Sequence, residues 1–211
     1  MANNLKKKPM KIICIGRNYA EHAKELNNDL PEEPLFFLKP DTALLKDKDF
    51  YYPNFTNDLH FECEIVVKID KVGKNIDEKF ASKYYSEITL GIDFTARDLQ
   101  QKCKEKGLPW EKAKGFDNSA PISIKWIKLD DINFNATEFC FYQNGVLKQQ
   151  GRTRDMIFSI DQIIAHVSKF MTLKTGDLIY TGTPAGVGPV VIGDCLNATL
   201  NGEDAFTFFV K

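Results

Sequence analysis

Two glutamates alternate along a segment that has the composition of a β-strand, L-H-F-E-C-E-I-V-V-K-I-D at residues 59 to 70. Successive side chains of a strand point to opposite faces, so Glu62 and Glu64 share one face, roughly 7 Å apart at the backbone for a rise of about 3.3 Å per residue. Like charges this close repel one another unless water screens them or a cation lies between them. The segment therefore predicts either a solvated acidic rim or a cation site.

A third carboxylate stands in a second alternating segment, I-T-L-G-I-D-F-T-A-R-D at residues 88 to 98, where Asp93 projects from the face opposite the apolar side chains. If the two strands are neighbours, three carboxylates converge. An all-oxygen site suits a hard cation such as Mg²⁺, Mn²⁺ or Ca²⁺, whereas zinc recruits histidine or cysteine. Cys63 lies between the glutamates but points to the other face, so it is not counted as a ligand.

The residues after Asp93 predict a helix that begins beside this candidate site. Thr95-Ala96-Arg97-Asp98 is a capping-box sequence, and the positive end of such a helix attracts anions. The alternative is a well-capped surface helix that has no part in binding.

A histidine and a carboxylate lie three residues apart in N-Y-A-E-H-A-K-E-L-N, where a helix is predicted over about 19 to 27 with Asn18 as its cap. His22 and Glu25 would share one face, as a base and the carboxylate that orients it. The alternative is an ordinary surface pair. Lys114 has little support of its own, because most lysines are solvated.

Composition indicates an ordinary globular protein. The chain has 211 residues, 43% hydrophobic and 27% charged, with a net charge of -1, which favours neither nucleic-acid nor membrane-surface binding. No apolar run approaches the about 20 residues that span a bilayer. We expect one domain over 1–211, with a solvated tail over 1–10. Five scattered cysteines with no disulfide-like spacing predict a reducing, cytoplasmic location.

The remaining pattern predicts an α+β or mixed β architecture, because strands do not alternate regularly with helices. Asn144-Gly145 and Asn201-Gly202 are typical of hairpin turns. A helix is predicted over about 160 to 171, with Ser159 and Gln162 as a capping box. Its buried face would carry Ile160, Ile163, Ile164, Val167 and Phe170.

The glycine-rich loop at 181–188 matches no nucleotide-binding pattern and is interpreted as a tight turn. Strands are predicted at about 11–15, 35–38, 59–69, 86–94, 137–143, 177–182 and 205–210.

Seven motifs in one order together resemble the fumarylacetoacetate hydrolase family, over roughly residues 11 to 194. They are G-R-N-Y-A-E-H, F-F-L-K-P, H-F-E-C-E-I, G-I-D-F-T-A-R-D-L-Q, K-G-L-P-W-E-K-A-K-G-F-D, N-G-x-x-x-Q with M-I-F-S-I, and G-D-L-I-Y-T-G-T-P-A-G-V-G. The stretch K-G-L-P-W is similar to the short acylpyruvate hydrolase and oxaloacetate decarboxylase branch. The resemblance implies a mixed β-sandwich roll, a homodimer, and a Mg²⁺ or Mn²⁺ ion held by three carboxylates.

The resemblance also implies roles for particular residues. Glu62, Glu64 and Asp93 would hold the metal, and Lys114 would lie beside it. His22 and Glu25 would activate water on a segment that orders over the substrate. The implied substrate-binding residues are Arg17, Lys39, Arg97, Gln100 and Thr183.

The implied activity is cleavage of a carbon–carbon bond in a small 2-oxo acid, by acylpyruvate hydrolysis or oxaloacetate decarboxylation, because a metal stabilises the enolate that both reactions generate. An isomerase or tautomerase of oxo-dienoates or oxaloacetate is the second hypothesis. A non-catalytic module that binds Ca²⁺ is the third. Arg152 and Arg154 depart from the small polar residues usual in the family. They would favour a more acidic substrate if either reached the pocket.

Overall fold

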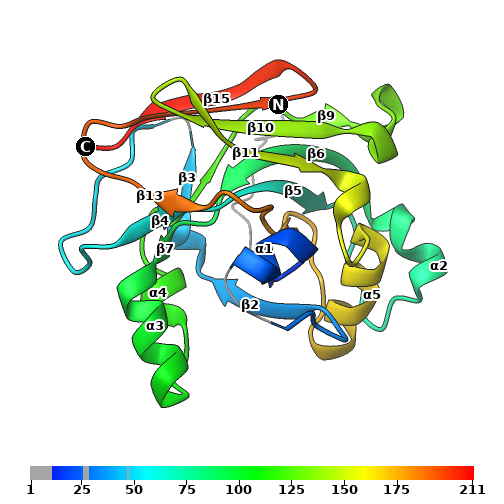
Figure 1. Cartoon of the computed structure of the whole chain (residues 1–211). Helices are drawn as coiled ribbons and strands as arrows, with labels where there is room; N and C mark the ends of the chain where they lie inside the picture. The colour runs from blue at the N-terminus through cyan, green and yellow to red at the C-terminus, as the bar shows by residue number, and fades with distance from the viewer. Residues whose placement is uncertain (1–10, 26–28, 47) are drawn as a thin grey trace, which may run out of the picture.

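An eight-stranded mixed sheet forms the centre of the protein (Figure 1). The computed structural model describes residues 11–25, 29–46 and 48–211. In the sheet, β1 pairs with β12 and β3 pairs with β8 in parallel, and the other pairings are antiparallel. The strand order is β2-β1-β12-β5-β6-β8-β3, and β9 pairs with β6. The bounds are β1 (Ile12–Gly16), β2 (Leu35–Lys39), β3 (Leu44–Lys46), β5 (Cys63–Ile69), β6 (Tyr85–Ile92), β8 (Ala120–Ile122), β9 (Ile127–Lys128) and β12 (Leu178–Tyr180).

A four-stranded antiparallel sheet lies across one side of the first, at the top of Figure 1. Its order is β11-β10-β14-β15, from β10 (Glu138–Gln143), β11 (Val146–Arg152), β14 (Cys195–Leu200) and β15 (Glu203–Phe209). The predicted turns Asn144-Gly145 and Asn201-Gly202 join its two hairpins, with φ of 54° and 76° in the first and 52° and 84° in the second. Asparagine and glycine tolerate this left-handed backbone, so the prediction of both turns is confirmed.

A small third sheet orders β13-β4-β7, from β4 (Leu59–Phe61), β7 (Thr95–Ala96) and β13 (Gly188–Pro189). The strand predicted over 59–69 is therefore divided, because Glu62 lies between β4 and β5 and belongs to neither. This division places the two halves of the segment in different sheets.

The core lies between the two larger sheets. Ile65 and Leu90 from the central sheet and Phe139 and Phe141 from the four-stranded sheet belong to one cluster, and each is fully buried. Burial of apolar surface between sheet faces is the main stabilising contribution in such a layered fold. The predicted α+β class and the sandwich-roll architecture are confirmed.

Five described helices connect or cover the sheets: α1 (Ala20–Glu25), α2 (Glu78–Ala81), α3 (Arg97–Lys106), α4 (Glu111–Lys114) and α5 (Ile160–Phe170). Short 3₁₀ turns occur at Asp41–Ala43, Ser82–Tyr84, Leu129–Asp131, Phe134–Ala136 and Thr153–Asp155. The predicted capping box of α5 is present in full. Phe170 was wrongly assigned to its buried face: the side chain is 60% exposed and packs against Phe36 and His166.

Two predicted helix caps are wrong. The Asn18 side chain does not cap α1. Its amide NH₂ donates to the carbonyls of Phe158 and Thr181 and its carbonyl accepts from the Phe158 N–H, so Asn18 joins three segments that are far apart in the sequence. Helix α3 begins at Arg97 without a side-chain cap, since Thr95 donates to the carbonyl of Asp93 instead. The predicted tail over 1–10 and the end of the helix predicted over 19–27 lie outside the described residues.

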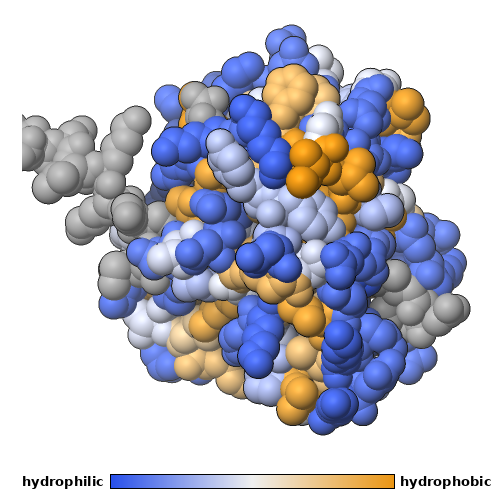
Figure 2. Space-filling view, turned by 90° about the vertical axis from the view of Figure 1, so that its left-hand side faces the viewer, coloured by the Kyte–Doolittle hydropathy of each residue, from blue (hydrophilic) through white to orange (hydrophobic). Residues whose placement is uncertain are grey.

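Hydrophilic residues dominate the face shown in Figure 2, where apolar residues form small separated patches. Within the described residues, no helix is long and apolar enough to cross a membrane.

Candidate active site and metal centre

Three carboxylates meet in the interior beside the central sheet. One oxygen from each of Glu62, Glu64 and Asp93 lies within 4.8 Å of the others, and these residues are only 6%, 1% and 1% exposed. The backbone explains the meeting: β5 and β6 pair with Cys63 opposite Ile92, and the Asp93 N–H donates to the Glu62 carbonyl at 2.8 Å. A solvated acidic rim is excluded by this burial.

Cationic side chains surround two of the carboxylates. Lys114 Nζ lies 2.7 Å from Glu62 Oε2 and 2.8 Å from Asp93 Oδ2, and the Arg97 guanidinium donates to Glu62 Oε1 at 2.6 Å. Burial alone would raise the pKa of Glu62, but the charges of Lys114 and Arg97 outweigh it and hold that pKa well below its ordinary value. Glu62 is therefore ionised at neutral pH.

Glu64 is placed differently from its neighbours. Its described hydrogen-bond donor is the backbone N–H of Gly182, at 2.7 Å from Oε2. Burial and the charges of Asp93 and Glu62 raise its pKa well above the ordinary value. A divalent cation between the three groups would relieve this repulsion, and an all-oxygen donor set is what Mg²⁺ and Mn²⁺ prefer. The residues thus fit the metal that the sequence predicts.

A base stands close to the carboxylates, on α1. His22 is 5% exposed, and its Nδ1 lies 3.0 Å from Glu25 Oε2. Glu25 in turn accepts from the Gly186 N–H at 3.0 Å. With Nδ1 engaged by the carboxylate, Nε2 is the ring nitrogen left to exchange a proton. The predicted pairing of these two side chains is therefore present.

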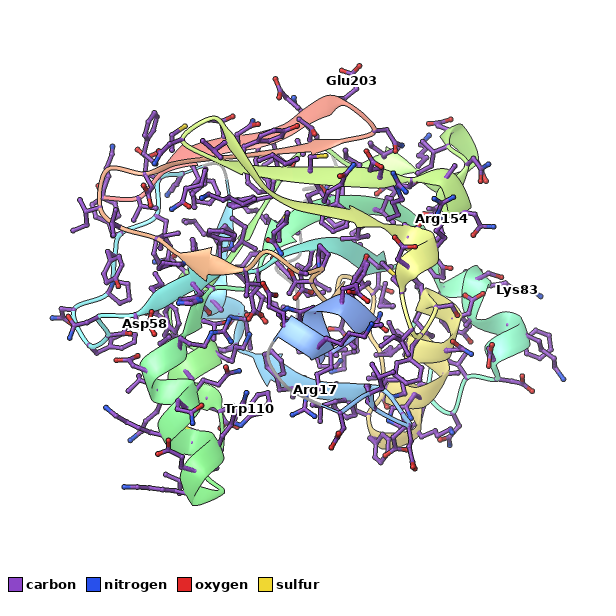
Figure 3. The ribbon with its side chains drawn as sticks, in the orientation of Figure 1. Arg17, Asp58, Lys83, Trp110, Arg154 and Glu203 are labelled. Atoms are coloured by element: carbon purple, nitrogen blue, oxygen red, sulfur yellow. The ribbon has the colours of Figure 1, made fainter. Side chains whose placement is uncertain are left out.

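One pocket joins these groups. Besides the carboxylates and His22, its walls include Arg17, Arg97, Gln100, Lys114 and Thr183. Arg17 has a φ of 59°, a left-handed conformation that is uncommon for residues with a Cβ and is frequent at functional sites. In Figure 3, Arg17 is labelled below α1, and Trp110, another wall residue, beside the α3–α4 pair. The pocket combines acidic, basic and imidazole groups in one place.

The structure does not bring every predicted residue to the pocket wall. Lys39 lies behind Asp93, 1% exposed, with its Nζ 2.8 Å from Asp93 Oδ1. It also donates to the carbonyls of Phe94, Lys114 and Ser119. This places it as a support for the carboxylate instead of at the expected substrate-contacting position. Glu25, which pairs with His22, does not line the pocket either, and it is exposed.

Arg152 and Arg154 do not line the pocket. Their side chains are 45% and 61% exposed, and Arg152 pairs with Glu138. Figure 3 labels Arg154 at the upper right, away from Arg17. Of the two sequence-based alternatives, the structure supports solvated arginines.

Several supporting residues were missed by sequence reasoning. Gln149, 1% exposed, accepts from the Cys63 N–H at 2.9 Å and donates to Thr183 Oγ1 at 2.7 Å and the Pro184 carbonyl at 2.8 Å. It therefore ties the strand break at Glu62 to the glycine-rich loop. That loop is a turn, as predicted, but its Gly182 and Gly186 N–H groups also hold Glu64 and Glu25. The N-G-x-x-x-Q motif was the available signal for Gln149, and K-G-L-P-W was the signal for Trp110 of the pocket wall. Lys104, which also lines the pocket, lies in none of the quoted motifs.

Known proteins resemble this chain over nearly all of its length. A family model described as fumarylacetoacetate (FAA) hydrolase C-terminal matches residues 11–208. The mitochondrial oxaloacetate decarboxylase of Dictyostelium discoideum is 45% identical over 198 residues, which cover 92% of this chain and 90% of that protein. The mitochondrial oxaloacetate tautomerase of Mus musculus is 44% identical over 201 residues, with 95% and 91% covered.

A solved structure shows the same fold. The fumarylpyruvate hydrolase of Pseudomonas aeruginosa, in complex with Mn²⁺ and pyruvate, superposes with a TM-score of 0.90 at 33% identity and covers 96% of this chain and 89% of that one. These relatives are enzymes of small oxo acids, and the resemblance extends through every segment that supplies the pocket. By sequence and by fold, the chain belongs to the fumarylacetoacetate hydrolase family.

Proposed function

We propose that the protein is a divalent-metal-dependent enzyme that cleaves a carbon–carbon bond in small 2-oxo acids, with oxaloacetate as its first substrate. The observation that carries this proposal is the convergence of three buried carboxylates with His22 in one pocket. The names of the relatives support the substrate class, since they include an oxaloacetate decarboxylase and a fumarylpyruvate hydrolase.

Glu62, Glu64 and Asp93 would hold Mg²⁺ or Mn²⁺. Such an ion would supply Lewis-acid stabilisation for negative charge that develops on the 2-oxo group. The Mn²⁺ and pyruvate in the related hydrolase support a similar use of the site here.

The cations of the pocket would hold the substrate and its charge. Lys114, 3% exposed, lies between Glu62 and Asp93 and presents a fixed positive charge where the enolate would form. Arg97 is held by Glu62 and by the side-chain carbonyl of Gln100 at 2.7 Å, so its guanidinium is preorganised. These contacts exist before any substrate arrives, which reduces the reorganisation needed during reaction.

His22 would perform the proton transfers. Oriented by Glu25, it would remove a proton from a water molecule that attacks the distal carbonyl of an acylpyruvate, and cleavage would release pyruvate in its enolate form with a carboxylic acid. Decarboxylation of oxaloacetate releases carbon dioxide and requires no attacking water. His22 would then only deliver a proton to the enolate carbon.

Tautomerisation of oxaloacetate is the second candidate, and it is favoured by the relative from Mus musculus that carries this name. His22 could transfer the proton between carbon and oxygen that interconverts the keto and enol forms. The same site would serve both activities, because each develops an enolate with its negative charge on the 2-oxo oxygen: the pyruvate enolate in decarboxylation and the oxaloacetate enolate in tautomerisation.

One experiment separates the candidates. Pyruvate release and the ultraviolet absorbance of the enol would be followed together on oxaloacetate, and pyruvate release separately on acetylpyruvate, each with Mg²⁺, Mn²⁺ or a chelator and with the rate due to metal alone subtracted. Pyruvate release that depends on protein and metal would support cleavage. A change of enol absorbance without pyruvate release would support the tautomerase and contradict cleavage. The relatives from Dictyostelium discoideum and Mus musculus are mitochondrial by name; a cytoplasmic location for this chain stays a prediction.

A further inference from the structure

One side of α3 presents three polar residues to the pocket. Arg97, Gln100 and Lys104 follow one another at i, i+3 and i+7, which places them on one helix face, and all three line the pocket wall. Arg97 is occupied by Glu62 and by the carbonyl of Gln100. The amide NH₂ of Gln100 has no partner within the described ranges, although the residue is only 5% exposed.

Lys104 stands at the exposed end of this row, at the mouth of the pocket. Neither Lys104 nor Arg17, which reaches the same pocket from the segment before α1, has an ion pair or side-chain hydrogen bond with any described residue. Partial burial and the positive charges of Arg97 and Arg17 lower the pKa of Lys104. Two cations and an amide N–H group therefore line one pocket without a direct ion pair or hydrogen bond to its carboxylates, and an anionic group of a ligand would satisfy all three.

The carboxylate cluster and Lys114 occupy the inner part of the pocket, so the 2-oxo acid end of a substrate belongs there under the function proposed above, on which this inference rests. The other end of the substrate would then point to the mouth. We propose that Lys104, with Arg17 and Gln100, binds the distal carboxylate of a dicarboxylic 2-oxo acid, and that Lys104 thereby selects diacids over monoacids of the same length.

The other lysines of α3 do not share the position of Lys104 in the pocket wall. Lys102 and Lys106 are exposed on the same helix, and neither lines the pocket. Lys102 is therefore a matched control, with the same charge on the same element and without the proposed contact.

The test compares wild type, Lys104→Gln and Lys102→Gln in binding and in turnover. Calorimetry with Mg²⁺ present would measure the affinities for 2-oxoglutarate and 2-oxopentanoate, which share a chain length and differ in the terminal carboxylate. Lys104→Gln is expected to weaken 2-oxoglutarate binding about tenfold and to change 2-oxopentanoate binding by less than about twofold, as for loss of one charged contact. Lys102→Gln is expected to change neither affinity.

In turnover, Lys104→Gln is expected to raise KM for oxaloacetate and leave kcat/KM for acetylpyruvate nearly unchanged. Equal losses for the diacid and the monoacid, or no loss for either, would overturn the inference. So would a wild type that does not prefer the diacid in binding. A wild type that prefers the diacid through Lys104 but turns over no 2-oxo acid would contradict the proposed reaction and leave the binding inference supported.

Discussion

Glu64 shows at the scale of one residue how the site is prepared for a cation. Glu62 and Asp93 have lysine or arginine nitrogens within 2.8 Å, whereas the described donor to Glu64 is a backbone N–H. The metal-free protein therefore keeps an acid whose ionised form is disfavoured. A divalent cation would offset the unfavourable charge of ionised Glu64. The same buried charge would therefore strengthen metal binding and lower the stability of the metal-free protein.

Glu64→Gln tests this connection. Because the folded-state pKa of Glu64 is raised, the folded protein binds a proton more tightly than the unfolded chain, and its stability falls as pH rises from the ordinary carboxyl pKa toward the raised value. The glutamine variant should lose this fall, so that without metal it is at least as stable as wild type at neutral pH. It should also lose metal binding and activity.

Denaturant unfolding at several pH values in a chelator, with calorimetry for metal, makes both measurements. Glu78→Gln, on the exposed start of α2, is the control and should behave as wild type. A glutamine variant that kept full metal affinity would refute the assignment of Glu64 as a ligand.

His22→Ala addresses the proton transfers. Since hydrolysis needs an activated water and decarboxylation does not, acylpyruvate hydrolysis should fall by about 100-fold or more, within the usual contribution of a general base, and oxaloacetate decarboxylation should fall less. Steady-state kcat values for both substrates measure the difference. His166→Ala, on α5 and away from the pocket, is the control. Equal losses in the two reactions would contradict the roles assigned to His22.

At the scale of elements, the site depends on how a strand break and a loop are held together. Glu62 lies between β4 and β5, and the loop after β12 supplies Gly182 to Glu64 and Gly186 to Glu25. Gln149 of β11 joins the break and the loop. The four-stranded sheet contributes none of the three carboxylates, but through Gln149 it is bonded to the backbone between Glu62 and Glu64.

Gln149→Ala should loosen this arrangement. Three hydrogen bonds would be lost and buried partners left unsatisfied, which should lower the free energy of unfolding by about 2–4 kcal/mol. Metal affinity should weaken about tenfold or more, in the range found for residues that orient ligands. Thermal unfolding and metal titration measure the two effects. Gln150→Ala, on the exposed face of the same strand, should change neither. Unaltered metal affinity in a destabilised Gln149→Ala would limit Gln149 to a structural role.

Local patterns predicted the elements whose cause is local. The Asn-Gly turns, the α5 capping box and the alternation that buries Ile88, Leu90 and Ile92 all follow from a few adjacent residues. Strand β11 was missed because V-L-K-Q-Q-G-R is mostly exposed and polar at the edge of its sheet. The break at Glu62 was missed because the alternation continues through it, and only pairing with separate sheets reveals it.

The residues of the candidate site also differ in how far their positions could be predicted from local sequence. The three converging carboxylates and the His22–Glu25 pair could be predicted, since residue type and spacing are visible in the sequence and the order of seven motifs indicated the family. Lys39 could not be placed, because its burial depends on carbonyls from Phe94, Lys114 and Ser119, which are far along the chain. The sequence around Lys39 does not indicate which distant carbonyl groups will surround its ammonium group.

For the whole molecule, metal binding should be coupled to stability. A ligand that binds only the folded state stabilises it by mass action, by about 2.7 kcal/mol at one hundred times its Kd. Added Mg²⁺ or Mn²⁺ should raise Tm, and a chelator should reverse the shift. Differential scanning calorimetry of wild type and Glu64→Gln measures this shift in Tm, and equal shifts in both would place the metal elsewhere.

The homodimer implied by the family resemblance stays a prediction, for which sedimentation equilibrium would give the mass.

The most direct test of the central claim is turnover of oxaloacetate, with pyruvate and enol absorbance followed in the same sample. We predict protein-dependent turnover above the rate of metal alone, lost in a chelator, restored by Mg²⁺ or Mn²⁺, and absent in Glu64→Gln. A rate that persists in the chelator or in Glu64→Gln would contradict the metal-dependent mechanism, and no turnover by metal-loaded wild type would contradict the proposed substrate.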